Sequence, residues 1–477
     1  MNAVQSSRIP RDRTLTQLAT ALDPQRMQSA FQKHFDRTHT CRIAECRIER
    51  IKYKPGKNCH VCYRLLLRHG GAKEGGSTQL VSARFYEPGG SASRFRKASG
   101  DRPGRDTGRD LVLHIPELDC IAWIFPSDRK LDNLDRITDS DFLAETVLPE
   151  LFADHFGASW SIVSVRSEMI RYVPEHTCSV RADIEMVHAS TEVRRSIIAY
   201  GKTYYNEEGR RTDRIMRQLW CSPPRYRSKL NIPQPIGYQP RHRLFWQLEV
   251  PGVPLSQLCA EKTLFLDGVA QAARQVALLH GIGLEHRRQP GQMGEEPLRQ
   301  LSKTIRLFDG FESPFRAQVN ALIARLTALM PAAPRDRLAL LHGDLHLKNI
   351  LSDGSRTYLI DLDNCAAGDP LQDVGSFIAA MLTFGVTGAL PQPLVDETIR
   401  VFLKNYGTPF AELRLRWHVA AALVGERVFR SVTRLKSGRL QRLGDLIDLA
   451  SSILEGGGSP EWLRPEHQVG STVGTGR

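Results

Sequence analysis

The pattern of apolar and polar residues changes along the chain near residue 259. Before that point, short apolar or alternating runs separated by proline-containing turns predict strands, together with a helical segment in each of two stretches. After it, segments such as FLDGVAQAARQVALLHGIGL and SFIAAMLTFG carry apolar residues at helical spacing. The pattern therefore predicts an α+β protein with sheets in its first half and mainly helices in its second half.

The strand-rich half contains an internal repeat. The segment IKYKPGKNCHVCYR (51–64) matches IRYVPEHTCSVRAD (170–183), and VSARFY (81–86) parallels AYGKTY (199–204). The aligned pairs include Tyr53 with Tyr172, Pro55 with Pro174, Cys59 with Cys178 and Val61 with Val180. Two copies of one strand-rich unit are therefore expected before the helical half.

These patterns divide the chain into six segments. The expected boundaries are an N-terminal segment (1–40), a degenerate first copy (41–135), a connecting helix (136–159), a nucleotide-binding second copy (160–258), a helical catalytic and substrate part (259–455) and a disordered tail (456–477). Thr138 or Asp139 is suited to cap the start of the connecting helix. A chain of 477 residues is long enough for several domains.

A cluster of polar residues inside an apolar frame lies between residues 340 and 375. Two short apolar runs on either side of an Asp-Gly turn at 353–354 predict a hairpin. Asp344 and Asn349 precede this hairpin, and Asp361 follows it directly. Three oxygen-bearing side chains are therefore expected to converge.

These three side chains suit phosphoryl transfer. Magnesium takes oxygen ligands and shares its coordination among one or two protein groups, water and substrate phosphates, which suits the Asn349 amide and the Asp361 carboxylate. Asp344 is then available as the base that accepts the proton of the attacking hydroxyl. An alternative interpretation is that the alternating His342, Asp344 and His346 bind a metal on a strand.

The segments HGDLHLKNIL (342–351) and LIDLDNCAAGDPLQDVGSF (359–377) resemble the catalytic and metal-binding segments of the aminoglycoside phosphotransferase and choline kinase group. The resemblance implies that Asp344 is the catalytic base and that Asn349 and Asp361 are Mg2+ ligands. It also implies that His342 braces the catalytic loop and that Asp373 is a buried carboxylate tying this loop to the next helix.

That group has the fold of the protein kinases. Protein kinases usually have Arg and Lys where this chain has Gly343 and His346, so the small-molecule branch fits better. The expected fold class is α+β, a protein-kinase-like two-lobe fold with a duplicated N-terminal small lobe and a mainly α-helical C-terminal lobe.

The second copy of the repeat is expected to supply the nucleotide-binding half of the site. Lys202 lies in its third strand, where a kinase places the lysine that holds the nucleotide phosphates. The first copy has Arg84 at the equivalent position, which indicates a degenerate duplicate. The carboxylate partner of Lys202 stays open among Glu207, Glu208 and Asp213.

The linker after the second copy resembles the hinge between kinase lobes. Backbone groups of Leu248, Glu249 and Val250 are expected to bind the adenine of ATP, although an ordinary Pro-Gly turn explains the same residues. The chain has no GxGxxG loop. The turn at 174–178 would then have to cover the phosphates.

Composition and charge narrow the possible partners. The formal charge of +13 suggests nucleic acid as a possible partner. The 65 lysines and arginines form no long basic tract, however, so no nucleic-acid partner is expected. No stretch approaches the ~18 apolar residues of a membrane span, and the N-terminus lacks the core of a signal peptide. These features predict a cytoplasmic protein without a membrane partner.

The chain has nine cysteines, an odd number that suits reduced thiols better than a disulfide framework. Four of them have a spacing that also suggests zinc: Cys41, Cys46, Cys59 and Cys62. Residues three apart on a strand point to opposite faces, so buried thiols are the favoured interpretation.

The sequence therefore predicts an ATP- and Mg2+-dependent kinase of a small molecule with a hydroxyl group. A helix from about 413 to 436 carries many cations and one acidic residue: Arg414, Arg416, Arg427, Arg430, Arg434 and Lys436 against Glu426. These cations would repel a polycationic aminoglycoside, so a sugar or similar neutral or anionic metabolite is the expected acceptor. A solvated basic face explains the same pattern equally well.

Three other functions stay open at this point. They are an aminoglycoside phosphotransferase, a kinase of proteins and a nucleotide-binding regulator without turnover. An intact base and both metal ligands argue against the regulator. The oligomeric state does not follow from the sequence.

Overall fold

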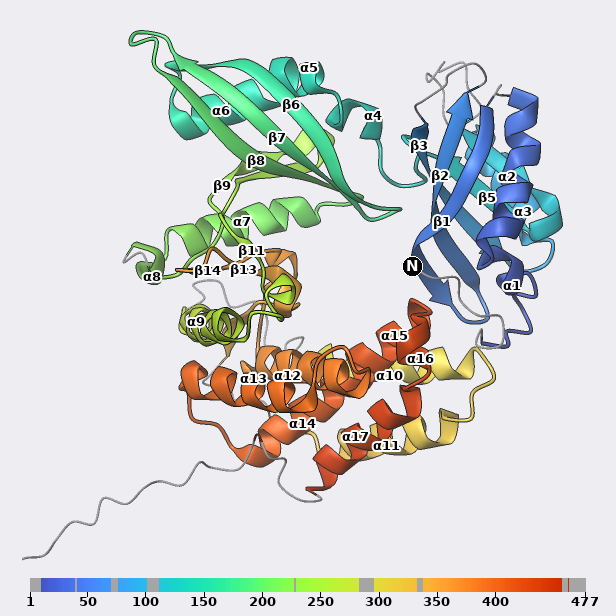
Figure 1. The fold of residues 1–477 in the computed structure, drawn as a ribbon, viewed down its shortest axis with the longest axis vertical. Helices are drawn as coiled ribbons and strands as arrows, with labels where there is room; N and C mark the ends of the chain where they lie inside the picture. Colours follow the sequence, from blue (N-terminus) through green and yellow to red (C-terminus); the bar gives the residue numbers. More distant parts are fainter. Residues whose placement is uncertain are drawn as a thin grey trace, which may run out of the picture.

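The computed structural model describes residues 10–38, 41–69, 76–100, 111–226, 229–282, 296–332, 338–456 and 462. Figure 1 shows three parts: a first sheet at the right, a second sheet at the upper left, and a mainly helical part below both. The predicted α+β fold class, with a duplicated sheet region before a mainly helical C-terminal part, is confirmed. The predicted tail falls almost entirely outside the described residues.

The first sheet has five antiparallel strands in the order β1-β2-β3-β5-β4. Its strands are β1 (Cys41–Lys54), β2 (Asn58–His69), β3 (Ser77–Tyr86), β4 (Val112–Ile115) and β5 (Cys120–Ile124), and its helices are α1 (Leu18–Ala21), α2 (Pro24–Thr38) and α3 (Gly90–Gly100). Buried and exposed residues alternate along much of β1, because one face of the strand packs against α2. Cys41, Cys46, Cys59 and Cys62 are buried free thiols.

The second sheet repeats the strand order of the first, β6-β7-β8-β10-β9. Its elements are β6 (Trp160–Val173), β7 (Thr177–His188), β8 (Arg194–Tyr204), α7 (Glu208–Trp220), α8 (Pro223–Tyr226), β9 (Pro235–Gln239) and β10 (Leu244–Leu248). In both sheets a helix follows the third strand. The internal repeat seen in the sequence therefore corresponds to two copies of one folded unit.

The connection between the copies is helical but not a single helix. It contains α4 (Leu134–Ile137), α5 (Ser140–Phe142), a π-helical turn (Leu143–Val147) and α6 (Leu148–Phe156). Asp139 caps α5 by accepting hydrogen bonds from the N–H groups of Asp141 and Phe142. Pro149 follows the π-helical turn and lacks the N–H that a continuous α-helix needs there, which accounts for the irregularity.

The helical part begins after the linker that follows β10. Its helices are α9 (Lys262–His280), α10 (Glu296–Asp309), α11 (Arg316–Ala328), α12 (Leu371–Val386), α13 (Gln392–Tyr406), α14 (Glu412–Ala422), α15 (Phe429–Thr433), α16 (Ser437–Leu440) and α17 (Leu443–Glu455). A π-helical segment, Leu423–Val428, joins α14 to α15. Among the described residues, every helix is too short or too polar to cross a lipid bilayer.

Two small sheets hold the polar cluster above these helices. One contains β11 (Val253–Pro254), β13 (Ile350–Ser352) and β14 (Thr357–Leu359), and the other pairs β12 (Ala339–Leu341) with β15 (Ala366–Gly368). The predicted hairpin is therefore β13–β14. β11 pairs with β13, so the linker from the second sheet lies directly against this hairpin.

In each of the two large sheets, the first two strands form a long hairpin (β1–β2 and β6–β7). The turn of each hairpin is held by an aspartate that precedes the sheet in the sequence. Asp12 accepts a hydrogen bond from the Tyr53 hydroxyl at 2.7 Å, and Asp128 accepts one from the Tyr172 hydroxyl at 2.5 Å. Each aspartate also accepts a backbone N–H of the turn itself. The matching segments RDRTLTQL (11–18) and SDRKLDNL (127–134) extend the internal similarity upstream of residue 41.

Each of the three parts contacts both others. The β1–β2 turn packs against Gly310 at the end of α10, and β1 also contacts α15. The β6–β7 turn reaches the first sheet, where Glu175 accepts hydrogen bonds from Arg129 at 2.8 Å and forms an ion pair with Arg84 at 3.1 Å. The second sheet meets the helical part through the linker and α7. The contacts therefore close into a ring.

Candidate active site

The loop between β12 and β13 is fixed by the buried carboxylate of Asp373. The backbone N–H groups of His342 and Gly343 donate to this carboxylate at 2.6 and 2.9 Å, and the His280 ring lies 3.0 Å from it. Gly343 has a φ of 77°, and a Cβ atom there would collide with the backbone oxygen of Asn364, so this position requires glycine. The protein itself therefore sets the loop conformation.

The side chain of His342 connects this loop to the segment after β14. The imidazole is fully buried, and its Nε2 lies 3.0 Å from the carbonyl oxygen of Ile360. Ile360 directly precedes Asp361, so the contact fixes the spacing between the two acidic segments. This position agrees with the bracing role that the sequence resemblance implies.

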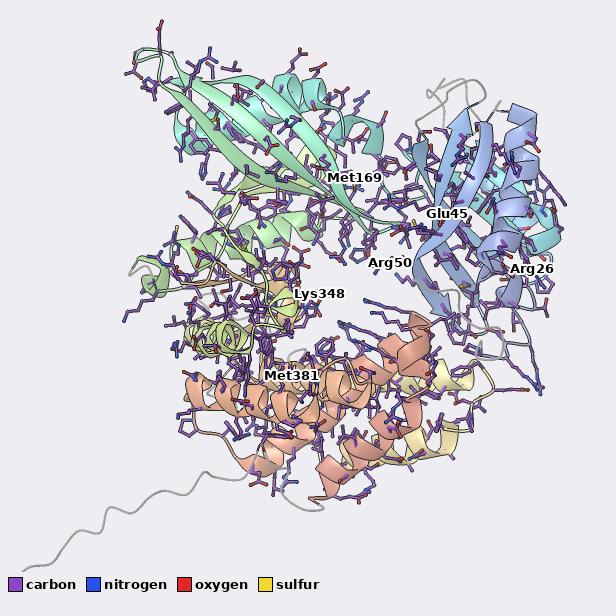
Figure 2. All side chains as sticks on the ribbon, in the orientation of Figure 1. Arg26, Glu45, Arg50, Met169, Lys348 and Met381 are labelled. Atoms are coloured by element: carbon purple, nitrogen blue, oxygen red, sulfur yellow. The ribbon has the colours of Figure 1, made fainter. Side chains whose placement is uncertain are left out.

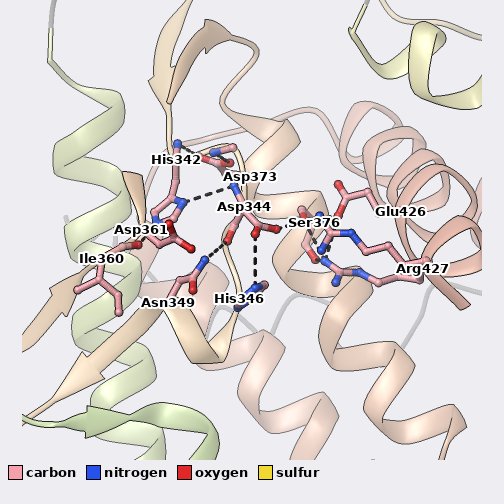
Figure 3. A network of polar contacts seen from close by, with 12 residues as sticks. His342, Asp344, His346, Asn349, Ile360, Asp361, Asp373, Ser376, Glu426 and Arg427 are labelled. Carbon is pink, nitrogen blue, oxygen red and sulfur yellow. Dashed lines mark hydrogen bonds and ion pairs between the residues drawn. The ribbon is translucent and has the colours of Figure 1, made fainter. Parts of the chain in front are cut away.

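Asp344 projects from the loop toward the long helical segment of the C-terminal part. Its carboxylate accepts a hydrogen bond from Arg430 at 3.0 Å and lies 3.6 Å from Nε2 of His346 (Figure 3). Burial alone would raise the pKa of Asp344, but the positive charge of Arg430 lowers it overall. Asp344 is therefore ionised at neutral pH, as a general base must be. Burial lowers the pKa of the neighbouring His346 to about 4, so this imidazole is neutral at neutral pH.

Asn349 and Asp361 lie on the opposite side of Asp344 from that helix (Figure 3). The Asn349 amide nitrogen donates to the backbone oxygen of Asp344 at 3.0 Å, and the side-chain oxygen of Asn349 has no hydrogen bond to a described residue. Asp361 has a left-handed backbone with φ of 60°, and one of its carboxylate oxygens has no hydrogen bond to a described residue. One amide oxygen and one carboxylate fit Mg2+, which usually takes one or two protein ligands beside phosphates and water.

The described residues contain no group of three or more His, Cys, Asp or Glu side chains that could enclose a metal ion. The alternating His342, Asp344 and His346 are therefore not gathered around one point. His342 faces Ile360 and is fully buried, whereas His346 faces the Asp344 carboxylate.

Lys202 reaches this cluster from β8 in the second sheet. Its ammonium contacts Asp361 at 2.7 Å and also contacts Asp363. Burial would lower the pKa of Lys202, but the two carboxylates raise it overall, so the lysine is charged. The structure therefore brings Lys202, Asp344, Asn349 and Asp361 together from segments more than 140 residues apart in sequence.

The carboxylates considered as partners of Lys202 are engaged elsewhere. Glu207 pairs with Arg210, Asp213 pairs with Arg217, and Glu208 accepts a hydrogen bond from Asn206. Asp363 takes their place, because its carboxylate contacts the Lys202 ammonium. It also accepts hydrogen bonds from Tyr204 of β8 and Thr212 of α7, so it joins the second sheet to the catalytic segment.

The linker residues lie where the second sheet ends. The N–H groups of Leu248 and Glu249 donate to Gln234 and Ile198 at 2.9 Å each. The backbone N–H of Val250 has no hydrogen-bond partner among the described residues. Val250 therefore offers an unused donor in this segment, which a nucleotide base requires.

Arg430 is the residue of this site that sequence reasoning did not assign. It lies 86 positions after Asp344, on α15, and the sequence analysis placed it only in a basic helical face. Other cations of that face also turn inward: Arg414 binds Asp369 and Arg427 binds Ser376. A helical pattern of arginines gives no signal that distinguishes such inward contacts from a solvated face.

Comparison with known proteins shows that part of the chain is similar to one protein family. Residues 200–418 match the model of the phosphotransferase enzyme family. The matched range includes Lys202, the linker, the catalytic loop and α12, so the resemblance noted in the sequence is confirmed over this range. A search of curated proteins found no match.

Solved structures with a similar fold include small-molecule kinases. Aminoglycoside phosphotransferase APH(4)-Ia has 16% sequence identity and a TM-score of 0.44, covering 66% of this chain and 99% of that one. A thermostable mutant of that protein was solved as a ternary complex with ADP and hygromycin B. A choline/ethanolamine kinase family protein from Mesorhizobium loti has 14% identity and a TM-score of 0.41, covering 61% of this chain and 93% of that one.

Proposed function

We propose, from the match of residues 200–418 to a phosphotransferase family, that the protein is an ATP-dependent kinase. It transfers the γ-phosphate of ATP to a hydroxyl group of a small molecule, a sugar or similar neutral or anionic metabolite. The observation that supports this best is the convergence of an ionised Asp344, the Asn349 and Asp361 oxygens, and Lys202 in one cluster.

Asp344 is the catalytic base in this proposal. The acceptor hydroxyl oxygen attacks the γ-phosphorus, its proton passes to the Asp344 carboxylate, and the bond between the γ-phosphorus and the oxygen of the leaving ADP breaks. Arg430 keeps Asp344 ionised before the transfer, and His346 lies beside the carboxylate as a neutral imidazole. Because both also contact this carboxylate, they set its direction toward the acceptor.

The nucleotide lies between the second sheet and the catalytic segment. Lys202 offsets the charge of the phosphates, and backbone groups of Leu248 to Val250 hold the adenine. Asn349 and Asp361 would hold Mg2+. When bound, Mg2+ neutralises charge on the phosphates and orients them for in-line transfer.

A polycationic acceptor fits this site poorly. The Asp344 carboxylate is already paired with Arg430, and further cations of the same helical segment lie close to it. An aminoglycoside would need carboxylates to offset its own charges. This argument favours a neutral or anionic acceptor.

The test is Mg2+-dependent formation of ADP with a panel of sugars, sugar phosphates, amino sugars, aminoglycosides, choline-like alcohols and model proteins. Asp344→Asn keeps the shape of the side chain but removes the base, so turnover is expected to fall at least about 1,000-fold. The Kd for ATP, measured by calorimetry, should change less than threefold. Equal turnover by wild type and variant would remove Asp344 from the mechanism, and tight ATP binding without any turnover would favour a regulator.

A further inference from the structure

Basic side chains from all three parts of the molecule gather beside Asp344. Arg430 contacts Asp344 directly, and α15, which carries it, packs against β1 of the first sheet. Arg50 of β1 lies near enough to Arg430 and to Arg171 of β6 to interact with both electrostatically. Arg434 interacts with the same three arginines. We call Arg50, Arg171, Arg430 and Arg434 the arginine cluster.

Arg430 and Arg434 belong to the helical segment on the side of Asp344 away from Asn349 and Asp361, whereas Arg171 also acts electrostatically on Asp361, so the arginine cluster reaches from this segment toward the proposed metal ligands. Asp344 separates Asn349 and Asp361 from the helical segment that precedes α15 (Figure 3). Arg50 lies on the edge of the first sheet that faces the catalytic part, and Lys348 lies across from it (Figure 2). This is the side from which an acceptor hydroxyl must approach the base.

Three members of the cluster lack the partners that arginines usually have. The side chains of Arg50, Arg171 and Arg434 form no ion pair or hydrogen bond with any described residue, whereas the side chain of Arg430 contacts Asp344. Glu426, the nearest further carboxylate on this helical segment, is engaged by Arg427 and Ser376. The protein therefore holds unpaired positive charges close together.

This gathering of cations has a cost for the protein alone. Burial and the charges of Arg430 and Arg50 lower the pKa of Arg434 to about 10. Burial and the charges of Arg439 and Arg434 lower the pKa of Lys436, at the end of the same segment, to about 8. Like charges at short range repel each other, so an anion that enters the cluster gains their combined attraction.

We propose that the arginine cluster binds a phosphate group already present on the acceptor, so that the enzyme phosphorylates a free hydroxyl of a phosphate monoester. This inference rests on the proposed kinase function and specifies its acceptor. A phosphate monoester carries nearly two negative charges and three acceptor oxygens, and guanidinium groups bind such oxygens in pairs. A single carboxylate would neutralise only one of the unpaired arginines.

The same assignment gives the first sheet a function. Arg50 belongs to the first copy of the repeat and has reached the site because β1 packs on α15. The first copy therefore contributes to recognition of the acceptor, while the second copy holds the nucleotide. A kinase with one sheet would lack this contribution.

The experiment compares matched acceptor pairs, each a hexose or polyol and its phosphate monoester, by ADP formation. The phosphorylated member of a pair should have a kcat/KM at least about 100-fold higher. Arg50→Gln and Arg434→Gln should each raise the KM for that acceptor at least about tenfold, with kcat and the KM for ATP within about twofold. Arg47→Gln, on β1 but exposed and paired with Glu45, is the matched control and should behave as wild type.

Binding without turnover separates this inference from the proposed function. Calorimetry with glycerol phosphate, on Asp344→Asn saturated with a non-hydrolysable ATP analogue, should show binding that Arg50→Gln and Arg434→Gln weaken and Arg47→Gln does not. Glycerol should not bind. Turnover of unphosphorylated acceptors, unaffected by Arg50→Gln and Arg434→Gln, would overturn the arginine cluster assignment but leave the kinase intact. Phosphate binding to the cluster without ATP binding or turnover would overturn the proposed kinase instead.

Discussion

At the scale of single residues, the site depends on a balance between burial and charge. Asp344 and Lys202 are both largely buried, and each keeps its charge because it has oppositely charged partners. Arg430 sets this balance for Asp344, and Asp361 and Asp363 set it for Lys202. Charge loss at any of these partners is therefore expected to change the ionisation of its neighbour.

Arg430→Gln is expected to raise the pKa of Asp344, because a positive neighbour that favours the carboxylate is removed. The base works only when ionised, so activity is lost as the pH falls through the pKa of Asp344. In the wild type this acidic limb of kcat lies below the ordinary pKa of 3.8. In the variant it should move to higher pH, and Arg430→Lys should restore most of the shift. If the acidic limb of the kcat profile lay at the same pH in wild type and variant, Arg430 would have no effect on the pKa of Asp344.

Lys202→Met is expected to raise the KM for ATP at least about tenfold, because it removes the charge that offsets the phosphates. It also leaves Asp361 and Asp363 without their shared cation. Steady-state kinetics at saturating acceptor measures the effect. Lys262→Met removes an exposed lysine that pairs with Glu397 and should leave the KM for ATP unchanged. Equal KM values in both variants would reject the nucleotide role of Lys202.

The residues of the site differ in how far the sequence could predict them. Asp344, Asn349 and Asp361 lie within 18 positions of one another, so a single local pattern places them around one hairpin. Lys202 was found through the internal repeat. Arg430 and Asp363 act through contacts between distant elements, which depend on how α15 and β8 pack and leave no local pattern.

At the scale of elements, the turn between β6 and β7 is held in place by residues that lie outside the second sheet. Glu175 lies in this turn with φ of 58° and binds Arg84 and Arg129, and its N–H is capped by Asp128. Arg84 occupies in the first sheet the position that Lys202 occupies in the second. Each of these cations therefore binds acidic residues of the part that follows it in the chain.

Glu175→Gln is expected to destabilise the protein by about 2 kcal/mol, because Arg84 and Arg129 lose a charged hydrogen-bond partner. Burial would raise the pKa of Glu175, but its hydrogen bond from Arg129 and the nearby charge of Arg84 lower it to about 2. The stabilisation is therefore present above the unfolded pKa near 4.5 and is lost as the pH falls toward 2.

Urea unfolding of wild type and Glu175→Gln at pH 7 and pH 3 checks this prediction. The difference in unfolding free energy should be large at pH 7 and smaller at pH 3. A double-mutant cycle with Arg84→Gln should show coupling between the two positions. Additive effects of the two substitutions, or a difference that grows at pH 3, would contradict the role of this ion pair.

The elements themselves were largely predictable, since apolar periodicity and turn residues are local signals. The strands of both copies, the hairpin at 350–359 and the main helices follow the predicted pattern. The break in the connecting segment was not predicted, although Pro149 gave a signal for it. The contact of the β6–β7 turn with the first sheet was not predicted, because the sequence analysis assigned that turn to the phosphates alone.

At the scale of the whole molecule, three parts close a ring of contacts. The first sheet completes this ring through a tight approach between the β1–β2 turn and Gly310, where a Cβ atom would lie 2.8 Å from the backbone oxygen of Pro55. A buried apolar cluster is continuous from the first sheet into the helical part. The position of Arg50 near Arg430 depends on this contact.

Gly310→Ala is expected to push the β1–β2 turn away from α10, because the added methyl group meets backbone atoms that cannot rotate aside. Unfolding free energy should fall by about 1–3 kcal/mol, and the KM for the acceptor should rise more than the KM for ATP. Gly438→Ala places a methyl group in open space and is the matched control. A rise in the KM for ATP alone would show that the first sheet serves the nucleotide site instead.

The ion pair at Glu175 also limits how the molecule moves. A phosphate-covering turn that is free at its tip opens and closes as a flap, and only a few backbone angles change. Here the tip is fastened to the first sheet, which itself packs against Gly310 and α15 of the helical part, so the turn cannot open alone. Cutting the Glu175 contact would uncouple the sheets, so nucleotide exchange would speed up while acceptor capture slowed.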